Sequence, residues 1–426
     1  MLIFAATSTV TAGDNAWVLV SAALVLLMCI PGLFLFYGGL VRSKNVLSVA
    51  AQCLALTAMG ILMWWGFGYS LVFGKSLQGS VTGLFYGGTE HLAFAGIDSS
   101  ASIYEGRISS GTFAIFQAMF AAITPALIIG AVAERMKFSA VMIFSALWTL
   151  LVYYPVAHAV WGQSGDFAGI ANAQSTFKAV DFAGGIVVHM TSGWSALILC
   201  MIVGPREGFG KRAMAPHSMV LCVLGTGLLW AGWYGFNAGS ALAADGIAVQ
   251  AFLTTSLAAA AATISWAAVE IFHRGKPSVL GLCSGSIAGL ATITNAAGYV
   301  STSSAVLIGT IAGAASYWAC SYLKGKLKYD DALDTFGVHG VGGTIGAIAT
   351  ALLICPKVNP ATEALKNSSV IKDQLIAMVL CIVLSVVATV IIAKLVQKTI
   401  GLRPTEEEEA QGLDIADHGE EGYNQG

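Results

Sequence analysis

The stretch GGIVVHMTSGW, Gly184 to Trp194, has the composition of the beginning of a membrane-spanning helix, yet it contains a histidine, His189. A titratable imidazole inside hydrocarbon costs stability, so its presence indicates a hydrogen-bonding partner or a function. A second stretch, DTFGVHGVGG from Asp334 to Gly343, places His339 at the start of another apolar run. The two stretches point to the fold class, because each begins one of a series of apolar segments.

Apolar residues predominate in most of the rest of the chain as well. Of its 426 residues, 56% are hydrophobic and 10% are charged, whereas soluble globular proteins contain about 25% charged residues. Apolar runs of at least about 18 residues recur along it, which is typical of transmembrane helices. The sequence therefore predicts an all-α polytopic protein that crosses a cell membrane (the inner or plasma membrane) many times. No cluster of Lys and Arg suggests nucleic acid as a partner.

We predict eleven transmembrane helices. Their approximate boundaries are 17–40, 47–72, 111–133, 138–161, 183–203, 218–240, 249–272, 279–297, 303–323, 335–355 and 372–400. With the N-terminus outside, fifteen of the 21 Lys and Arg residues fall on cytoplasmic segments. Cytoplasmic loops carry an excess of basic residues, so we expect the N-terminus outside and the C-terminus inside.

An internal repeat relates the two histidine stretches. An Asp-Phe element precedes His189 at Asp181 and Phe182, and a similar one precedes His339 at the start of the tenth span. If spans one to five and six to ten are related halves, the odd number of spans gives them opposite orientations. We therefore expect a five-plus-five inverted repeat followed by a final helix, with the transport pathway between the halves.

The chain divides into a membrane domain, residues 1–400, and a tail, residues 401–426. The tail, which continues LRPTEEEEAQGLDIADHGEEGYNQG after Gly401, is acidic and polar, so we expect its EEEE run to be solvated on the cytoplasmic side. Leu413, Ile415 and Tyr423 alternate with polar residues and predict that part of the tail docks onto another surface.

Three ionisable residues within or beside the spans are interpreted as structural. Glu134 and Glu270 lie close to basic residues at the inner helix ends and are expected to form surface ion pairs. His158 lies near the outer end of the fourth span and is expected to face the external headgroups, with a functional role as the open alternative.

His189 and His339 are interpreted differently. At the helical rise of about 1.5 Å per residue, His189 lies about 12 Å beyond Asp181 and His339 about 8 Å beyond Asp334. A lone histidine at such depth is commonly a packing residue, but two at corresponding points of a repeat indicate a shared site. Facing neutral imidazoles suit a proton relay or a small neutral solute such as ammonia or water. The two aspartates are expected to cap free amides at the helix starts, and to support a nearby cation.

Aromatic residues mark the outer helix ends. Phe116 and Phe120 are one turn apart on the third span, and Phe236 and Ser240 are one turn apart on the sixth. Trp161 ends the fourth span. Interfacial aromatics are commonly lipid anchors; the alternative is a cluster that binds a small cation through its ring faces.

Six motifs of the chain resemble the ammonium transporter (Amt/Mep/Rh) family, and most closely its bacterial Amt type. The motifs are PGLFLFYGGLVRSKN, GAVAERMKFSAVMIF, DFAGGIVVHMTSG, WYGFNAGS, GKPSVLGLCSGSIAGL and FGVHGVGG, and the tail resembles that of the family as well. The resemblance implies eleven helices with an inverted repeat, a homotrimer with one pore per subunit, and a cytoplasmic tail that meets PII-family signalling proteins. Residues 73–110 match least well, and nothing is carried onto them.

The resemblance also assigns site residues. The implied roles are pore histidines for His189 and His339, ammonium recruitment for Phe116, Trp161 and Ser240, closure of the outer pore mouth for Phe120 and Phe236, and supporting carboxylates for Asp181 and Asp334.

The predicted function is ammonium transport for nitrogen uptake. NH₄⁺ is recruited at the external cation–π site and loses a proton, and ammonia crosses a hydrophobic pore lined by the twin histidines. One alternative is an ammonium sensor that signals through a PII-type partner, and another is a redox protein with His189 and His339 as haem ligands. No nucleophile–base constellation predicts an enzyme, and no cofactor or metal is expected. Passage of methylammonium and the movement of net charge stay open.

Overall fold

The computed structural model describes residues 10–76, 81–101, 106–365 and 369–423. Within these ranges every regular element is a helix. Ten helices are long and apolar enough to cross a membrane, and an eleventh apolar helix, Val279–Ile293, is shorter. The prediction of an all-α fold with eleven apolar helices is confirmed. The eighth helix ends four residues before its predicted boundary, because turns replace the helix after Ile293.

The first five spans contain several irregular helical turns. Their elements are α1 (Ala12–Leu27), η1 (Met28–Leu33), α2 (Phe34–Leu40), η2 (Ser43–Asn45), α3 (Val46–Met63), η3 (Trp64–Gly68), α4 (Tyr69–Phe73), α6 (Ser110–Val132), α7 (Phe138–Trp148), η5 (Thr149–Tyr153), α8 (Tyr154–Trp161), η6 (Gly185–Met190) and α9 (Thr191–Val203).

The remaining spans are more regular, and short helices lie outside them. The later spans consist of α10 (Met219–Gly239), α11 (Gly246–Arg274), α12 (Val279–Ile293), α13 (Thr302–Trp318), η7 (Ala319–Leu323), α14 (Lys324–Leu327), η8 (Phe336–Gly340), α15 (Val341–Leu353) and α16 (Val370–Thr399). The short elements are α5 (Val81–Phe85), η4 (Leu92–Phe94), η9 (Pro360–Leu365), α17 (Glu406–Gln411) and η10 (Asp414–His418).

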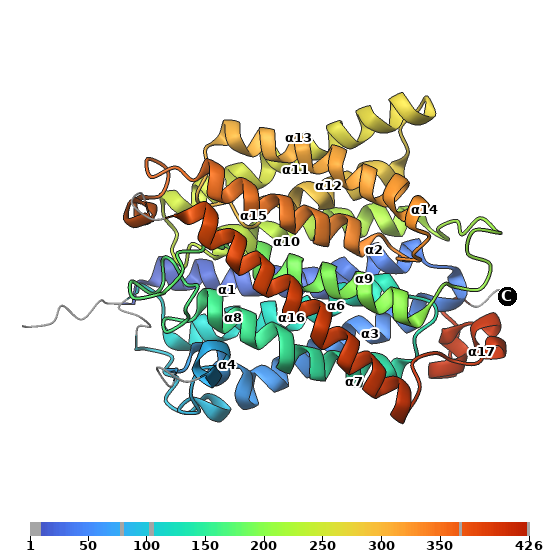
Figure 1. Cartoon of the computed structure of the whole chain (residues 1–426), viewed down its shortest axis with the longest axis horizontal. Helices are drawn as coiled ribbons and strands as arrows, with labels where there is room; N and C mark the ends of the chain where they lie inside the picture. Colours follow the sequence, from blue (N-terminus) through green and yellow to red (C-terminus); the bar gives the residue numbers. More distant parts are fainter. Residues whose placement is uncertain (1–9, 77–80, 102–105, 366–368, 424–426) are drawn as a thin grey trace, which may run out of the picture.

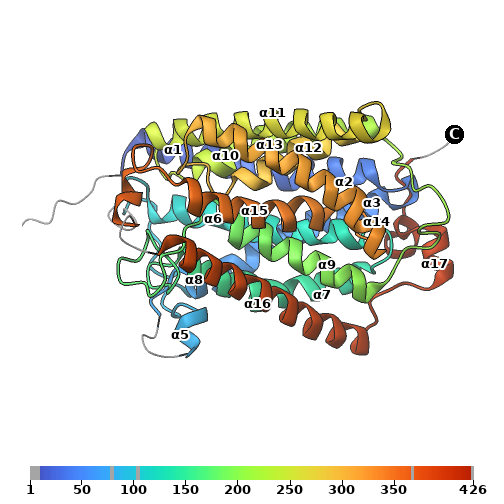
Figure 2. The same cartoon turned by 45° about the horizontal axis from the view of Figure 1, so that its top comes forward.

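The apolar helices run lengthwise through the molecule, with α17 at one end and α5 at the other (Figures 1 and 2). We call these the α17 end and the α5 end. Helix α16 crosses obliquely over the bundle and packs on α9, α7 and α15. Helix α11 packs against α12 and α13 on the opposite side. Helix α6, whose residues are almost all buried, lies in the interior.

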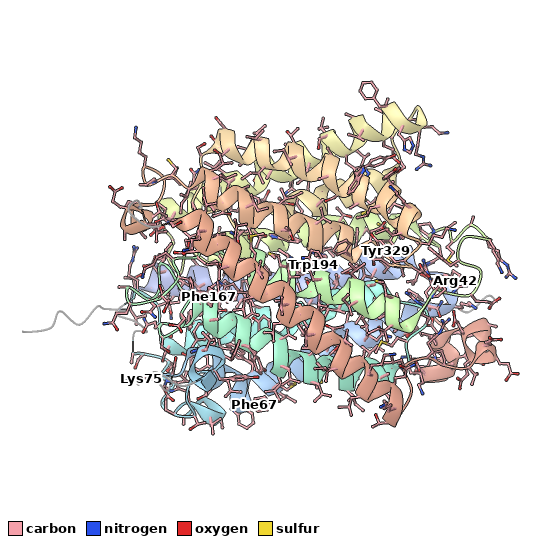
Figure 3. The ribbon with its side chains drawn as sticks, in the orientation of Figure 1. Arg42, Phe67, Lys75, Phe167, Trp194 and Tyr329 are labelled. Carbon is pink, nitrogen blue, oxygen red and sulfur yellow. The ribbon has the colours of Figure 1, made fainter. Side chains whose placement is uncertain are left out.

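Charged side chains gather at the two ends of the bundle. Figure 3 labels Arg42 at the α17 end and Lys75 at the α5 end. The tail docks at the α17 end, where the Lys44 ammonium donates to the carbonyl of Glu409 at 2.8 Å. By the positive-inside rule this end is the one expected in the cytoplasm.

The tail docks onto its own chain, as its alternating pattern predicts. Leu413 is fully buried and its amide donates to the Asn45 side chain at 2.9 Å. The Asp414 carboxylate accepts from the amide of Ser48, near the start of α3, at 2.7 Å. Tyr423 makes a hydrogen bond of 2.9 Å with His217. The docked segment therefore contacts both the beginning of the second span and the loop before α10.

The predicted surface ion pair of Glu134 is wrong. Glu134 is 2% exposed and lies between Arg42 and Arg206, with N–O distances of 2.9 Å to each guanidinium. Arg206 also pairs with Asp330 at 2.8 Å. Burial alone would raise the pKa of Glu134, but the two arginines outweigh it, so the pKa is lowered. The cluster is a buried network because the loops after α2, after α6, after α9 and before η8 converge on it.

The predictions that Glu270 and His158 lie at the surface are also wrong, because both side chains are buried. Glu270 is 2% exposed; besides its pair with Arg274 at 2.9 Å, it accepts from the Ser278 amide at 2.9 Å. His158 is fully buried and makes hydrogen bonds to the Val72 carbonyl at 2.7 Å and the Ser76 hydroxyl at 3.0 Å. Both side chains hold neighbouring loops in place instead of facing water or headgroups.

Candidate functional site

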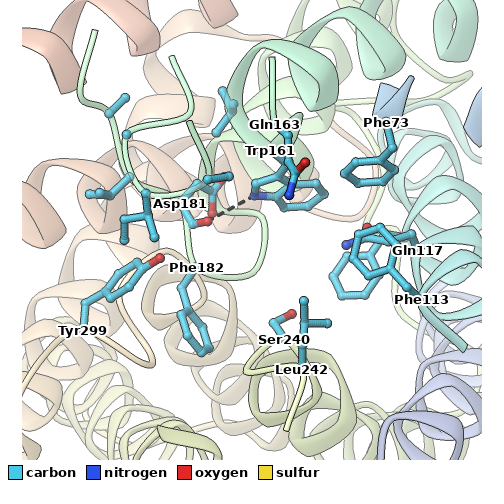
Figure 4. Close-up of a pocket in the computed structure, with 17 residues that line it drawn as sticks. Phe73, Phe113, Gln117, Trp161, Gln163, Asp181, Phe182, Ser240, Leu242 and Tyr299 are labelled. Atoms are coloured by element: carbon cyan, nitrogen blue, oxygen red, sulfur yellow. Dashed lines mark hydrogen bonds between the residues drawn. The ribbon is translucent and has the colours of Figure 1, made fainter. Parts of the chain in front are cut away.

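Two cavities lie on either side of a pair of aromatic rings. The larger, which we call the vestibule, has a volume of about 320 Å³, and Figure 4 shows the residues that line it. Its walls include Phe113, Gln117, Phe120, Trp161, Asp181 and Ser240. The smaller, which we call the lumen, has a volume of about 20 Å³ and is lined mainly by apolar side chains. A cavity of this volume holds about one molecule of the size of water.

The vestibule brings together ring faces and a few polar atoms. The Trp161 indole donates to the carbonyl of Asp181 at 3.1 Å, which fixes the orientation of its ring (Figure 4). The Ser240 hydroxyl donates to the carbonyl of Phe236 at 2.8 Å, so its lone pairs stay available to a donor. An ammonium ion, which has only donors, matches such acceptors and ring faces.

Phe116 does not line the vestibule. Its side chain is fully buried behind Phe120, with the two ring centroids 5.0 Å apart. The predicted recruitment role of Phe116 in direct contact with a cation is therefore corrected. Because α6 turns by about 100° per residue, Phe113 and Gln117 reach the vestibule wall and Phe116 faces inward.

Phe120 and Phe236 separate the two cavities. Phe120 lines the vestibule, Phe236 lines the lumen, and their ring centroids are 4.4 Å apart. Phe120 also packs edge-on against Trp161, with centroids 5.9 Å apart. The two ring planes are inclined by 40°, and the apolar rings disfavour a charged species between the two cavities.

His189 and His339 meet in the lumen. Their Nδ1 atoms are 3.2 Å apart and their ring planes are inclined by 18°. Since a hydrogen bond needs one donor and one acceptor, one imidazole carries its proton on Nδ1 and the other on Nε2. The Nε2 atom of His189 is buried and has no hydrogen-bond partner among the described residues. It is available to a small solute in the lumen.

The geometry excludes the haem alternative. The two imidazoles are in direct contact at 3.2 Å, and the cavity beside them measures about 20 Å³. A haem between two axial histidines needs room for its macrocycle, which a cavity of this size lacks. The ring of His189 is also covered by Trp233, with centroids 5.5 Å apart.

Asp181 caps the helix that carries His189. One carboxylate oxygen accepts from the amides of Gly184 and Gly185, and the other from those of Ile186 and Val187, at 2.7–3.0 Å. These amides have no partner within the helix, because they begin it. Burial raises the pKa of Asp181 to about 6 against these hydrogen bonds, and the four accepted amides stabilise the carboxylate form. Its predicted capping position is where the structure places it.

Asp331, and not Asp334, caps the helix that carries His339. The carboxylate of Asp331 accepts from the amides of Thr335 and Phe336 at 3.0 and 2.7 Å. Asp334 instead has a positive φ of 62° and pairs with Lys324 at 2.7 Å near the surface. The predicted role of Asp334 as the counterpart of Asp181 is therefore wrong. The available signal was spacing, since Asp331 precedes its histidine by the same eight residues as Asp181.

Two glycines that the sequence analysis overlooked hold the histidine helices together. Gly193 lies against the other helix so closely that a Cβ on it would be 2.1 Å from the amide nitrogen of Gly340. A Cβ on Gly343 would be 2.9 Å from the Gly185 carbonyl oxygen and 3.0 Å from the Cβ of His189. Each glycine follows its own histidine by four residues and contacts backbone at or next to the opposite histidine or its helix start. This repeated spacing could have revealed them.

Comparisons with known proteins agree with this arrangement. The model of the Ammonium Transporter Family matches residues 16–423. A putative ammonium transporter of Methanothermobacter thermautotrophicus is 46% identical over 96% of this chain and 98% of its own, and an ammonium transporter of Bacillus subtilis is 44% identical with the same coverage. This family consists of transporters and channels, not enzymes.

Solved structures are similar as well. Saccharomyces cerevisiae Mep2 has a TM-score of 0.83 at 34% identity, over 93% of this chain and 91% of its own. A structure titled Sensor Amt Protein has a TM-score of 0.85 at 30% identity, over 95% of this chain and 98% of its own. With a family match over nearly the whole chain and relatives above 40% identity, this multi-pass membrane protein belongs to the ammonium transporter family.

Proposed function

We propose that this chain takes up ammonium for nitrogen supply by admitting NH₄⁺ to the vestibule and conducting ammonia past His189 and His339. The observation that carries the proposal is the buried pair of imidazoles, with Nδ1 atoms 3.2 Å apart, beside an apolar lumen of about 20 Å³. A bare cation in such a lumen would lose hydration that apolar walls cannot replace. A neutral molecule of the size of water can enter it.

The first step is recruitment. The ring faces of Trp161 and Phe120 attract a small cation, and Ser240 offers an acceptor. Asp181 contributes a nearby negative charge, although its oxygens already accept four amides. We assign Phe116 to supporting the ring of Phe120, because it lies behind that ring.

The second step is the loss of a proton. When NH₄⁺ moves towards the Phe120–Phe236 pair it exchanges water for apolar rings, which favours the neutral form. One N–H bond breaks, its proton passes to a base, and NH₃ goes on into the lumen. In one version of the mechanism that base is vestibule water, and in the other the proton crosses separately by way of the two imidazoles. Ammonia donates to or accepts from the imidazole edges on its way to the opposite end, where it is protonated again.

The test is the double variant His189→Ala/His339→Ala in proteoliposomes. We expect the current on an ammonium concentration jump, measured on a solid-supported membrane, to fall at least about tenfold or to lose selectivity against potassium, since the polar edges of the lumen are gone. A net current in the wild type would favour the version with a separate proton path, and uptake without current would favour release to water.

His273→Ala is the matched control, because His273 lies outside the lumen and bonds to Tyr317 at 2.7 Å. Its transport should equal that of the wild type. Unchanged transport and selectivity in the double variant would remove the histidines from the mechanism.

We also propose a homotrimeric assembly, an external N-terminus, and a regulatory role for residues 401–426 through a PII-family protein. The family resemblance and the docked tail support these proposals. The tail contacts the start of α3 through Asp414 at 2.7 Å, so a partner that moved it would act on the second span directly. Crosslinking in native membranes and binding of a PII protein to intact and tail-truncated protein would test them.

The second candidate function is an ammonium sensor, and the similarity to a structure titled Sensor Amt Protein favours keeping it. Both functions use the vestibule, but a sensor requires no conduction through the lumen. Ammonium binding without uptake in proteoliposomes, together with an ammonium-dependent change in PII binding, would favour the sensor.

A further inference from the structure

A third cavity, which we call the tail cavity, lies between the docked tail and the loop that joins the first two spans. Its volume is about 360 Å³. Its wall consists of residues of two segments, 43–44 of the loop and 411–423 of the tail. Because both segments contribute to the wall, the cavity exists only while the tail is docked.

Asp414 contributes a buried oxygen that has no protein partner. Its side chain is 2% exposed, and its Oδ1 atom accepts from the Ser48 amide at 2.7 Å. Its Oδ2 atom is buried and has no hydrogen-bond partner among the described residues. A Cβ on Gly422, which lines the cavity, would lie 3.7 Å from Oδ2, so this oxygen is at the cavity wall. Buried carboxylate oxygens rarely lack a donor, and a ligand in the cavity can supply one.

The wall of the tail cavity carries more negative than positive charge. Asp414 and Glu421 contribute two carboxylates, and Lys44 contributes one ammonium group. That ammonium group already donates to the carbonyls of Glu409 and Ala410. Glu421 is exposed and forms no hydrogen bond or ion pair within the described part of the chain. The excess of carboxylate favours a cation in the cavity.

The other groups of the wall select the type of cation. The described residues include no group of three or more His, Cys, Asp or Glu side chains that could hold a metal ion. The Gln411 amide and the Ser43 hydroxyl add acceptors for N–H donors. Ile415 and Tyr423 add apolar surface, and an aromatic ring attracts an ammonium group. A volume of about 360 Å³ also leaves room for a short alkyl chain.

We propose that the tail cavity binds a protonated alkylamine, with its ammonium group between Oδ2 of Asp414 and the carboxylate of Glu421. The amine binds the docked tail and not the released tail, because only the docked tail forms the cavity. It therefore stabilises docking by linkage. This inference does not rest on the proposed transport function, since the tail cavity shares no residue with the vestibule or the lumen.

The test is hydrogen–deuterium exchange of the full chain in detergent, read at the amides of residues 413–423. Putrescine, ammonium chloride and potassium chloride are compared at equal ionic strength. We expect putrescine to slow the exchange about tenfold at ten times its dissociation constant, ammonium to slow it less, and potassium least. No effect of putrescine, or an equal effect of potassium, would overturn the proposal. Equal effects of ammonium and putrescine would overturn the choice of an alkylamine in favour of inorganic ammonium.

Glu421→Gln removes a charge from the wall without removing a contact of the docked tail. The affinity for putrescine, read from the dependence of the exchange rate on its concentration, should fall about three- to fivefold, the effect of one exposed ion pair. Glu420→Gln is the matched control, because Glu420 is an exposed neighbour that does not line the cavity. Equal loss of affinity in the two variants would contradict the proposed site.

Two further variants locate the amine. Asp414→Asn keeps Oδ1 as the acceptor for the Ser48 amide but replaces Oδ2 by an N–H donor, so the slowing by putrescine should disappear. If this variant releases the tail even without amine, Glu421→Gln decides. Trp161→Ala changes the wall of the vestibule and should leave the slowing intact. Loss of the slowing in Trp161→Ala would place the amine in the vestibule and overturn the proposal.

Discussion

The segments Asp181–Gly193 and Asp331–Gly343 use the same backbone arrangement in the two halves of the chain. In each, an aspartate caps the start of a helix, a histidine follows eight residues later, and a glycine follows the histidine by four. The two helices begin with the π-helical turns η6 and η8, which carry the histidines. The shared spacing explains how two segments 150 residues apart place their imidazoles face to face.

The segments differ in access and in the strength of the cap. Asp181 lines the open vestibule and accepts four amides, whereas Asp331 is 1% exposed and accepts two. The glycine contacts differ too, since a Cβ would be 2.1 Å from backbone at Gly193 and 2.9 Å at Gly343. One arrangement therefore serves an end that borders the vestibule and an end that is closed, and the cap beside the vestibule has more hydrogen bonds.

The largest expected effect is that of Gly193→Ala. Its Cβ would collide with backbone atoms of η8, so whole helices must shift, at a cost of about 3 kcal/mol or more. Gly343→Ala gives a milder clash, with its Cβ 2.9 Å from a backbone oxygen, and should cost about 1–2 kcal/mol. Thermal unfolding of the purified proteins measures both.

Gly227→Ala controls for the substitution itself, since a Cβ there meets nothing within 4 Å. It should leave the unfolding temperature unchanged or raise it slightly. If Gly193→Ala behaved like Gly227→Ala, the close contact would not position the histidines.

The second prediction compares the two caps. Asp181→Ala leaves four buried amides without an acceptor and Asp331→Ala leaves two. At about 1 kcal/mol for each unmet buried amide, the free energy of unfolding should fall by about 2 kcal/mol more in Asp181→Ala. Denaturation in matched detergent measures the difference. An equal or reversed order would show that the caps are not what distinguishes the two ends.

The third prediction concerns pH. Burial raises the pKa of Asp331 to about 6, against the ordinary aspartate value of about 4 in the unfolded chain. The folded state therefore binds more protons between about pH 4 and 6, so this carboxyl contributes stability at the acidic side that is lost as the pH rises. The unfolding temperature should fall by a few degrees across that window, and the fall should be smaller in Asp331→Asn. Parallel profiles for the two proteins would contradict the assignment.

The fold can be predicted well from the sequence, because membrane-spanning helices are identified by the length and hydropathy of apolar runs. An apolar run of bilayer length has few alternatives to a helix, since every backbone polar group in lipid must be satisfied. The same reasoning predicts that His189 and His339 lie inside the membrane. Each lies within an apolar run and is therefore away from the membrane–water interface. The predicted end of a helix is wrong where apolar residues continue past a turn, as they do after Ile293.

The details of the site depend on rotation about helix axes and on loop paths, which hydropathy does not encode. Phe116 and Phe113 are both apolar and close in sequence, but only packing decides which of them faces the vestibule. Glu134 has a basic neighbour in sequence, yet its partners come from two distant loops. The sequence pattern assigns the cap to Asp334 because the residues around Asp334 resemble those around Asp181. The eight-residue distance between aspartate and histidine, however, is the one found at Asp331.

The smallest expected effect tests that register directly. Asp334 pairs with Lys324 at 2.7 Å, and the side chains are 27% and 18% exposed. Asp334→Asn removes one partly exposed ion pair and no helix cap, so the free energy of unfolding should change by no more than about 0.5–1 kcal/mol. Asp331→Ala, three residues earlier, should cost clearly more because two buried amides lose their acceptor. If Asp334→Asn were as destabilising as Asp331→Ala, the equivalence of Asp331 with Asp181 would have to be abandoned, and with it the view that one spacing builds both ends of the pathway.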